Sequence, residues 1–361
     1  MGICISVAEE AHDDDNVTIF EARKVLNGSQ RLCSVYSKQG SKGLNQDAAS
    51  VHEGYGMEDG TFCGVYDGHG GNGHKVSKIV SSRLSSLILD QKNVLERIDE
   101  IENGYNNTTK KHVNSVKEEL PARNFQKWKE AIVSAFKVMD KEVKLQKNLD
   151  CFSSGNTAVV IIKQGEGLVI ANLGDSRAVL GTIYDEKLVA IQLTTDLKPE
   201  LPRDLQQKPL NHFFNMIVTR EAERIRRCNG CVCGSNEEPD IQRVWMPNNE
   251  NSPGLAMSRS LGDFLLKDHG VIAIPDVSYH PLTSTDQFIV LASDGVWDVL
   301  SNNEVASIVW SVDSEEAAAM AVVEAATAAW NEKYPSYMAD DCTVVCLFLH
   351  KKSQLTNLSA P

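Results

Sequence analysis

Apolar residues recur along the chain with two spacings, which separate predicted strands from predicted helices. Continuous or alternating apolar runs predict β-strands over residues 32–37, 61–66, 157–162, 168–173, 287–292 and 343–349. Apolar residues three and four positions apart predict amphipathic helices over residues 74–102, 128–143, 302–312 and 315–331. The polar stretch from 103 to 124 predicts a loop or a weak helix.

The order of these elements indicates the α+β class, because strands follow one another through short turns and helices come in long blocks. The sequence KQGEG predicts a hairpin between two of the strands, and GDSRAVLGTI after it is expected to extend the same sheet. We find no internal repeat. Residues 1–30 and 351–361 are predicted to be tails on one folded domain of residues 31–350.

Composition narrows the class of protein. The chain has 361 residues, of which 42% are hydrophobic and 24% charged, as in an ordinary globular protein. Its formal net charge of −13 argues against non-specific nucleic-acid binding, which needs clustered Lys and Arg. No apolar run predicts a secretory signal or a membrane-spanning helix. Most of the nine cysteines, such as Cys342 and Cys346, are therefore expected to be reduced core residues of a cytosolic protein.

The first six residues, MGICIS, carry a more specific signal. Gly2 with Ser6 fits the pattern for N-myristoylation, and Cys4 could take a palmitoyl chain. Two acyl chains anchor a protein stably to a membrane, whereas one anchors it weakly. We therefore expect a peripheral, lipid-anchored protein on the cytoplasmic face of the plasma membrane, with a cytosolic pool; the alternative is an unmodified chain start.

The stretch GVYDGHGGNG, residues 64–73, allows two interpretations. Asp-Gly is a common hairpin signal, and the glycines suit a turn. Glycine also lets backbone approach a metal ion or a phosphate closely.

The remaining aspartates favour the second interpretation. Apolar strands run into Asp67, Asp175 and Asp294, each beside a glycine. Asp263 also follows a glycine, Asp340 and Asp341 precede the last strand, and Asp47 follows GLNQ. Converging carboxylates repel one another unless cations neutralise them, and such oxygen-rich sites suit Mg²⁺ or Mn²⁺. A matching set of His and Cys residues for zinc is absent.

An ordered set of motifs resembles the metal-dependent Ser/Thr protein phosphatases of the 2C type, the plant-like members most of all. Between residues 32 and 350 the chain carries GSKGLNQD, VYDGHGG, SSGNTAVV, ANLGDSRAVL, TTDLKP, EAERI, GLAMSRSLGD, LASDGVWDVLS and DDCTVV in the order of the family. The resemblance implies a four-layer αββα sandwich with two central antiparallel β-sheets and a metal site at one end.

The resemblance also implies roles for individual residues. Asp67 bridges two Mn²⁺ or Mg²⁺ ions, and Gly68 offers its carbonyl to one of them. Asp263, Asp294 and Asp340 complete the shell of the second ion. Asp341 stands where many members have Asn, which leaves either Asp340 or Asp341 as that ligand.

Three further residues take supporting roles by resemblance. Asp175 serves a third, weaker metal site, Asp47 holds a metal-bound water, and His69 is the candidate general acid. Two metal ions lower the pKa of a shared water, which then attacks phosphorus, while a protonated histidine gives a proton to the departing oxygen. The Cys-x5-Arg arrangement of cysteine phosphatases is not apparent.

Besides Asp341, the chain departs from the family at four places. Lys42 stands where several members have an Arg that holds the phosphate, and Gln46 stands where others have Glu. Residues 204–220 look inserted within the flap region, about 196–250, and we expect them to alter or impair the flap. RCNGCVC, residues 227–233, suggests either a zinc knuckle, which lacks a second pair of ligands, or a thiol cluster.

The leading hypothesis is a phosphatase that releases phosphate from phosphoserine and phosphothreonine in proteins, through a water activated by two metal ions. An alternative is a catalytically impaired, membrane-tethered scaffold that binds phosphoproteins. A third is a metal-dependent hydrolase of a small phosphate ester. No coiled coil is apparent, so a monomer is expected.

Overall fold

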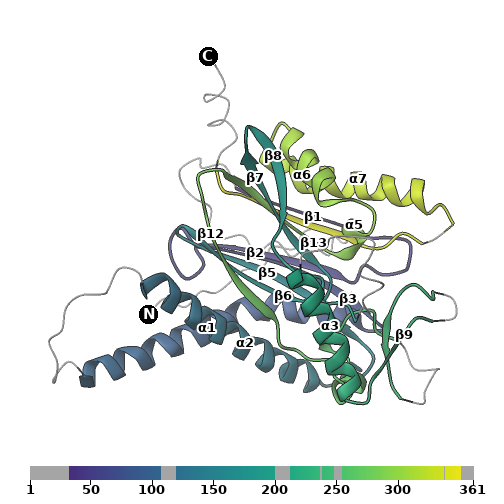
Figure 1. Ribbon diagram of the computed structural model, residues 1–361, viewed down its shortest axis with the longest axis horizontal. Helices are drawn as coiled ribbons and strands as arrows, with labels where there is room; N and C mark the ends of the chain where they lie inside the picture. The colour runs from purple at the N-terminus through teal and green to yellow at the C-terminus, as the bar shows by residue number, and fades with distance from the viewer. Residues whose placement is uncertain are drawn as a thin grey trace.

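The computed structural model describes residues 32–106, 119–199, 212–235, 238–247, 254–336 and 338–350. Two antiparallel β-sheets lie face to face at its centre (Figure 1). The first sheet has five strands, in the order β1 (Cys33–Lys38), β14 (Cys342–Phe348), β13 (Asp286–Ala292), β7 (Arg177–Tyr184) and β8 (Lys187–Gln192).

The second sheet has seven strands. Its order is β11 (Leu261–Gly262), β4 (Gly155–Asn156), β3 (Thr61–His69), β5 (Ala158–Gln164), β6 (Gly167–Leu173) and β12 (Asp276–Pro281), with β2 (Asp47–Glu53) paired to β3. The predicted hairpin is confirmed, since β5 and β6 pair in register from Ala158↔Leu173 to Gln164↔Gly167.

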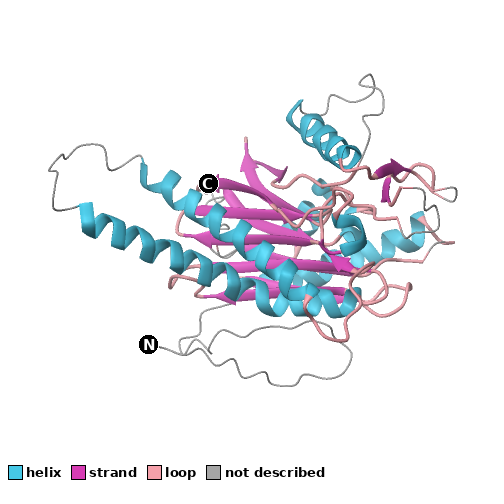
Figure 2. Cartoon of the chain, turned by 90° about the horizontal axis from the view of Figure 1, so that it is seen from below, coloured by secondary structure: helices cyan, strands magenta, loops and turns pink. Residues whose placement is uncertain are grey.

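Two pairs of helices cover the outer faces of the sheets. Helices α1 (Gly73–Asn106) and α2 (Glu119–Lys144) pack on the seven-stranded sheet around buried side chains such as Phe62, Leu84 and Phe136 (Figure 2). Helices α6 (Asn302–Ser311) and α7 (Ala318–Lys333) cover the five-stranded sheet. A third cluster of buried apolar residues fills the space between the sheets. This is the predicted four-layer αββα sandwich.

The segment Asp67-Gly68-His69 is strand and not a turn. β3 continues through these residues and pairs Gly68 with Asn156 and His69 with Gly155. The turn interpretation of this stretch is therefore wrong, because pairing with β4 overrides the local preference of Asp-Gly. The chain turns only afterwards, at Gly70, whose φ is +78°.

The prediction that residues 174–183 extend the hairpin sheet is also wrong. After β6 the chain crosses to the five-stranded sheet, where β7 pairs with β13 and β8. Gly174 makes the crossing possible: its φ is +106°, and a Cβ there would lie 2.6 Å from the Thr157 side chain. The crossing leaves Asp175 buried, 2% exposed, where the two sheets meet.

The remaining described elements are smaller and lie outside the two sheets. They are α3 (His212–Arg227), the hairpin of β9 (Cys231–Cys233) and β10 (Arg243–Trp245), α4 (Phe264–Lys267), α5 (Asp294–Trp297) and the 3₁₀ turn Glu315–Ala317. Residues 212–220 of the predicted insertion form the first turns of α3, while 204–211 lie outside the described residues. No helix in the described part of the chain is long and apolar enough to cross a membrane.

Candidate active site

Carboxylates from both sheets meet at one end of the sandwich. Asp47 begins β2 and lies directly opposite Asp67 on β3. Asp294 follows β13 at the start of α5, and Asp340 lies two residues before β14. Asp47 is buried, 3% exposed, whereas the other three are partly exposed. The cluster therefore has a buried base and a mouth open to solvent.

The electrostatics of these side chains show that they lie close together. Loss of solvent, followed by the charges of Asp47 and Asp294, raises the pKa of the Asp67 carboxyl well above its usual range. Loss of solvent and the charges of Asp175, Asp298 and Asp340 do the same to the pKa of Asp294. These carboxylates repel one another, and an ionised cluster needs cations nearby.

Asp47 is held in place by hydrogen bonds from the five-stranded sheet. The Ser293 hydroxyl donates to Oδ2 of Asp47 at 2.7 Å. Burial raises the pKa of Asp47 to about 7, although this hydrogen bond opposes the rise. Asp47 is thus fixed between the two sheets, behind Asp67.

The donor set at this end of the sandwich fits Mg²⁺ or Mn²⁺. These cations take carboxylate and carbonyl oxygens, which Asp67, Asp294, Asp340 and Gly68 supply. Oδ1 of buried Asp175 has no hydrogen-bond partner among the described residues, so it is free to accept a water or an ion. Within the described ranges, no three His, Cys, Asp or Glu side chains already form a complete metal-ligand cluster. What favours a cation is the crowding of partly buried acids.

Gly68 lies next to Asp67, at a point where the backbone is tightly packed. A Cβ at Gly68 would lie 2.5 Å from the carbonyl oxygen of Gly73 and 2.6 Å from that of Gln46. No side chain larger than hydrogen fits there. Nε2 of the neighbouring Gln46 donates to the carbonyl of Gly70 at 3.0 Å, while its Oε1 is buried without a hydrogen-bond partner among the described residues.

The structure distinguishes Asp340 from its neighbour Asp341. The Asp341 carboxylate accepts hydrogen bonds from the backbone N–H of Gly40 (2.7 Å) and of Gln46 (2.8 Å). Asp340 instead acts on the cluster, since its charge raises the pKa of both Asp67 and Asp294. Asp340 therefore acts on Asp67 and Asp294, whereas Asp341, whose charge raises the pKa of Asp47, is held by the loop around it.

Lys42 lies at the mouth of the cluster. Its Nζ is 2.5 Å from Oδ2 of Asp340, and half of its side chain is exposed. Burial lowers the pKa of Lys42, but the charge of Asp340 and its hydrogen bond outweigh this, so that the pKa is raised. A positive charge therefore stands at the mouth of the acidic cluster.

Lys198 is the second cation of the site, and the sequence alone did not predict a role for it. Its Nζ lies 3.5 Å from Oδ2 of Asp175. Burial alone would lower the pKa of Lys198, but the charges of Asp175 and Asp298 have a larger and opposite effect. The pKa is therefore raised, and Lys198 stays protonated. Lys198 belongs to the motif TTDLKP after β8, which was the only signal in the sequence that could have indicated its role. Only the fold brings this motif beside Asp175.

His69 ends β3 and is paired with Asp263. Its Nε2 lies 2.7 Å from Oδ2 of Asp263, while Nδ1 has no hydrogen-bond partner among the described residues. Burial lowers the pKa of His69, but the charge and hydrogen bond of Asp263 outweigh it and raise the pKa. The pair favours an imidazole that carries a proton.

The place of Asp263 differs from the one expected. The resemblance groups it with the ligands of the second ion, whereas the carboxylate reaches His69 and the largest charges acting on Asp67 and Asp294 come from other aspartates. Asp263 has a left-handed backbone, with φ of 50°, and a Cβ at Gly155 would lie 2.3 Å from its Oδ2. These constraints fix the carboxylate against His69 and explain the difference.

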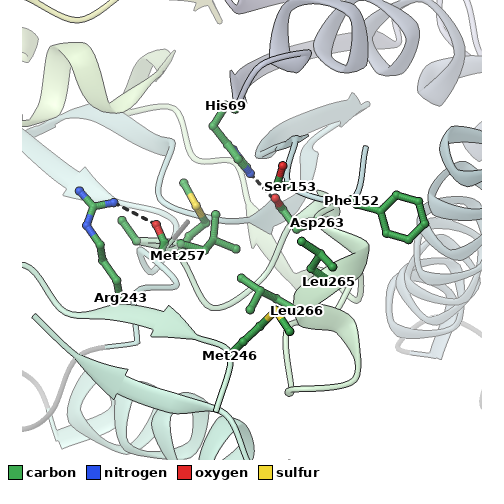
Figure 3. Close-up of a pocket in the computed structure, with 13 residues that line it drawn as sticks. His69, Phe152, Ser153, Arg243, Met246, Met257, Asp263, Leu265 and Leu266 are labelled. Carbon is green, nitrogen blue, oxygen red and sulfur yellow. Dashed lines mark hydrogen bonds and ion pairs between the residues drawn. The ribbon is translucent and has the colours of Figure 1, made fainter. Parts of the chain in front are cut away.

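A cavity of about 230 Å³ opens beside His69 (Figure 3). Its walls come from the end of β3, the loop before β4, the β10 strand end, the segment after residue 254 and α4. The predicted flap region contributes Arg243 and Met246 to this wall. The cavity therefore lies between the histidine and the flap hairpin.

A buried ionic cluster ties α3 to the segment that carries Asp263. Glu221, 2% exposed, accepts hydrogen bonds from Nε and Nη2 of Arg259, each at 2.8 Å, and from Nη1 of Arg224 at 2.5 Å. The Ser258 hydroxyl donates to the same carboxylate at 2.6 Å. These bonds hold the pKa of Glu221 at about 2 against the opposing effect of burial.

The cysteines of RCNGCVC form a surface group of thiols. Cys228, Cys231 and Cys233 are exposed, and the sulfurs of Cys231 and Cys233 lie 3.7 Å apart. Among the described residues they have no fourth partner for zinc. Gly2 and Cys4, the predicted lipidation sites, lie outside the described residues.

Comparison with known proteins agrees with this geometry. A model of the protein phosphatase 2C family matches residues 36–206 and 215–333, and leaves out 207–214 within the predicted insertion. The chain is 46% identical to probable protein phosphatase 2C 72 of Arabidopsis thaliana, over 98% of this chain and 99% of that protein. It is 45% identical to probable protein phosphatase 2C 12 of Oryza sativa subsp. japonica, over 97% of this chain and 92% of that protein.

Among solved structures, the serine-threonine phosphatase 2C of Toxoplasma gondii superposes on this chain with a TM-score of 0.69. The match covers 88% of this chain and 94% of that one, at 24% sequence identity. At this level of identity the likeness supports the fold alone.

Proposed function

The chain belongs to the protein phosphatase 2C family of serine/threonine protein phosphatases, and we propose that it hydrolyses phosphoserine and phosphothreonine in proteins with two Mn²⁺ or Mg²⁺ ions. One observation carries the proposal: Asp47 and Asp67 face each other on β2 and β3, and the other sheet brings Asp294 and Asp340 to the same place. Such a cluster has little structural use without cations, because its charges repel.

Asp67, Asp294, Asp340 and the Gly68 carbonyl would hold the two ions, and Asp175 would serve a third, weaker one. When bound, these ions would acidify a water molecule and neutralise charge on the phosphoryl oxygens. Asp47 lies behind Asp67 and would orient water through its carboxylate, which Ser293 already fixes.

His69 would give a proton to the departing serine or threonine oxygen. Its Nε2 is held by Asp263, so the transfer would use Nδ1, which is buried and has no hydrogen-bond partner among the described residues. We therefore assign Asp263 to the positioning of His69 and not to the second ion. The carboxylate also stabilises the protonated imidazole from which the proton comes.

The two lysines would act on the substrate phosphate and on the acids around it. Lys42 is half exposed at the mouth and can turn from Asp340 to a phosphoryl oxygen. As a point charge it cannot make the two parallel hydrogen bonds of an arginine. Lys198 would offset the negative charges of Asp175 and Asp298.

We also propose that the protein is a monomer held at the cytoplasmic face of the plasma membrane by acyl chains on Gly2 and Cys4, with a cytosolic pool. The sequence MGICIS supports this. Fractionation of cells that express the full chain tests it: Gly2→Ala should move the protein to the soluble fraction. An unchanged membrane fraction would contradict acylation at Gly2.

The activity is tested by phosphate release from a phosphothreonine peptide and from a phosphorylated protein, in Mn²⁺, in Mg²⁺ and in EDTA. We expect turnover that EDTA abolishes and that added Mn²⁺ restores. A folded protein that binds phosphoprotein but never releases phosphate would support the scaffold hypothesis. Turnover of small phosphate esters alone would support the third hypothesis.

A further inference from the structure

The cavity beside His69 is apolar along most of its wall. Its lining includes Phe152, Met246, Leu255, Met257, Leu265 and Leu266. Figure 3 shows Met246, Met257, Leu265 and Leu266 on the side of the cavity away from His69. Leu255, Met257 and Leu266 are buried, but Leu265 is 37% exposed and Phe152 is 56% exposed. Water therefore meets apolar side chains next to a charged site, which is costly unless a ligand covers them.

The charged groups of the wall are already neutralised. Arg243 binds Glu238 at 2.6 Å, and it also donates to the carbonyl of Gly254 at 3.3 Å. Nε2 of His69 pairs with Oδ2 of Asp263 at 2.7 Å. The cavity consequently offers apolar contact and no unpaired charge, so an apolar occupant fits it better than an acidic or a basic one.

The size of the cavity suits one side chain. At about 230 Å³ it is smaller than the roughly 300–1,000 Å³ of pockets that enclose drug-sized ligands. An apolar cavity of roughly 150 Å³ is enough to bind a benzene ring. The cavity is therefore the right size for one leucine, methionine or phenylalanine side chain.

The position of the cavity selects the source of that side chain. His69 lines the cavity and also gives the proton to the leaving oxygen in the function proposed above. The phosphorylated residue must therefore lie against the same imidazole. An extended chain advances about 3.3–3.6 Å per residue, so a residue one or two positions away reaches the cavity.

We propose that this cavity is a substrate subsite, which receives an apolar side chain one or two residues from the phosphoserine or phosphothreonine. The inference rests on the proposed function, since it takes His69 to contact the leaving group. The substrates would then be phosphosites that are flanked by a large apolar residue. Leu265 and Met246 on the cavity wall set this preference.

The test compares kcat/KM for phosphothreonine peptides that differ at one position. One series places Leu in turn at each of the two positions before and after the phosphothreonine, and the matched series places Gln there. We expect the wild-type protein to prefer Leu at one of these positions by about tenfold or more, the range for apolar groups in a fitted pocket. p-Nitrophenyl phosphate, which has no flanking residues, serves as the reference substrate.

Variants at the cavity wall should then change the ratio between the two peptides. Leu265→Glu should bring the Leu/Gln ratio close to one, and Met246→Glu, on another part of the wall, should do the same. The ratio cancels any general loss of activity. Tyr184→Glu is the matched control: this residue of β7 is 69% exposed and lies on the other sheet, so the ratio should stay at the wild-type value.

The outcomes separate the two proposals. If the protein hydrolyses p-nitrophenyl phosphate and all peptides with equal kcat/KM, the subsite is refuted and the phosphatase function stands. A preference for Gln over Leu at all four positions also refutes the apolar subsite. If no substrate releases phosphate in Mn²⁺ or Mg²⁺, the proposed function fails and this inference fails with it.

Discussion

Nε2 of His69 lies 2.7 Å from Oδ2 of Asp263, although the two residues are 194 positions apart in the chain. Strand β3 brings the imidazole to the end of its sheet, and the left-handed backbone of Asp263 turns the carboxylate toward it. The pair gives the site a proton donor whose partner is fixed. It also assigns Asp263 a role different from that of the aspartates around Asp67.

The first prediction separates these two roles of Asp263. Asp263→Asn should lower kcat for a phosphothreonine peptide and leave Mn²⁺ affinity unchanged, because the lost contact is with His69. For p-nitrophenyl phosphate the loss should be much smaller, since this leaving group departs without a proton. His69→Ala should lower kcat for the peptide by roughly 10²- to 10⁴-fold.

A double variant provides the control. Asp263→Asn should have little further effect in the His69→Ala background, because the residue acts through the imidazole. A weakened Mn²⁺ affinity in Asp263→Asn, measured by calorimetry, would instead make Asp263 a metal ligand.

The second prediction concerns the adjacent aspartates before β14. Asp340→Asn should weaken Mn²⁺ binding by at least about tenfold, a loss seen even for groups that only support metal ligands. Asp341→Asn should keep Mn²⁺ affinity but lower the free energy of unfolding by about 1–3 kcal/mol, because its carboxylate accepts two backbone N–H groups. Calorimetry and urea unfolding of both variants check this; a reversed pattern would exchange the two roles.

The third prediction concerns the charge at the mouth. Lys42→Ala should lower kcat/KM for a phosphopeptide by about 10- to 100-fold, the effect of losing a hydrogen bond to a charged group. Lys42→Arg should retain or raise kcat/KM, because a guanidinium can bind two phosphoryl oxygens at once. Lys38→Ala, an exposed residue of β1, is the matched control. An unaffected Lys42→Ala variant would remove Lys42 from phosphate binding.

The fourth prediction concerns stability. Glu221→Gln should lower the free energy of unfolding at pH 7 by about 3 kcal/mol, since it breaks a buried pair with Arg259 and Arg224. The same value follows from a pKa that falls from 4.5 to about 2. Glu223→Gln, a more exposed residue of the same helix, should change little.

The pH dependence of this effect has a definite sign. Because folding lowers the pKa of Glu221, the stabilisation is complete above its unfolded pKa of 4.5 and is lost as the pH falls toward 2. The difference in unfolding free energy between wild type and Glu221→Gln should therefore be constant from pH 7 to 5 and shrink below about 4.5. A difference that grows on acidification would contradict the assigned ion pairs.

The sequence predicts the layers of the fold well, because hydrophobic periodicity reports which face of each element is buried. The β5–β6 hairpin and helices α6 and α7 lie where the pattern predicts them. The pattern fails where pairing between distant strands decides the outcome. Asp67-Gly68-His69 looks like a turn in isolation, and only its pairing with Asn156 and Gly155 makes it strand. Likewise, nothing local to Gly174 indicates that the chain changes sheets there.

The site follows the same rule. Aspartates at strand ends predict the cluster of Asp67, Asp294 and Asp340, since strand ends gather at the edge of a sheet. The roles of Lys198 and Glu221 were not predicted from the sequence, because a lone charged residue gives no sign of its distant partner. The pairing of Asp263 with His69 depends on backbone geometry that the sequence does not reveal.

The most direct test of the account is phosphate release from a phosphothreonine peptide by wild type and Asp67→Asn across a range of Mn²⁺ concentrations. Asp59→Asn is the control, because this exposed residue lies in the turn between β2 and β3. We expect saturable, Mn²⁺-dependent turnover in wild type and Asp59→Asn, and none in a folded Asp67→Asn. Wild-type turnover in Asp67→Asn at every Mn²⁺ concentration would show that catalysis does not use the carboxylate cluster.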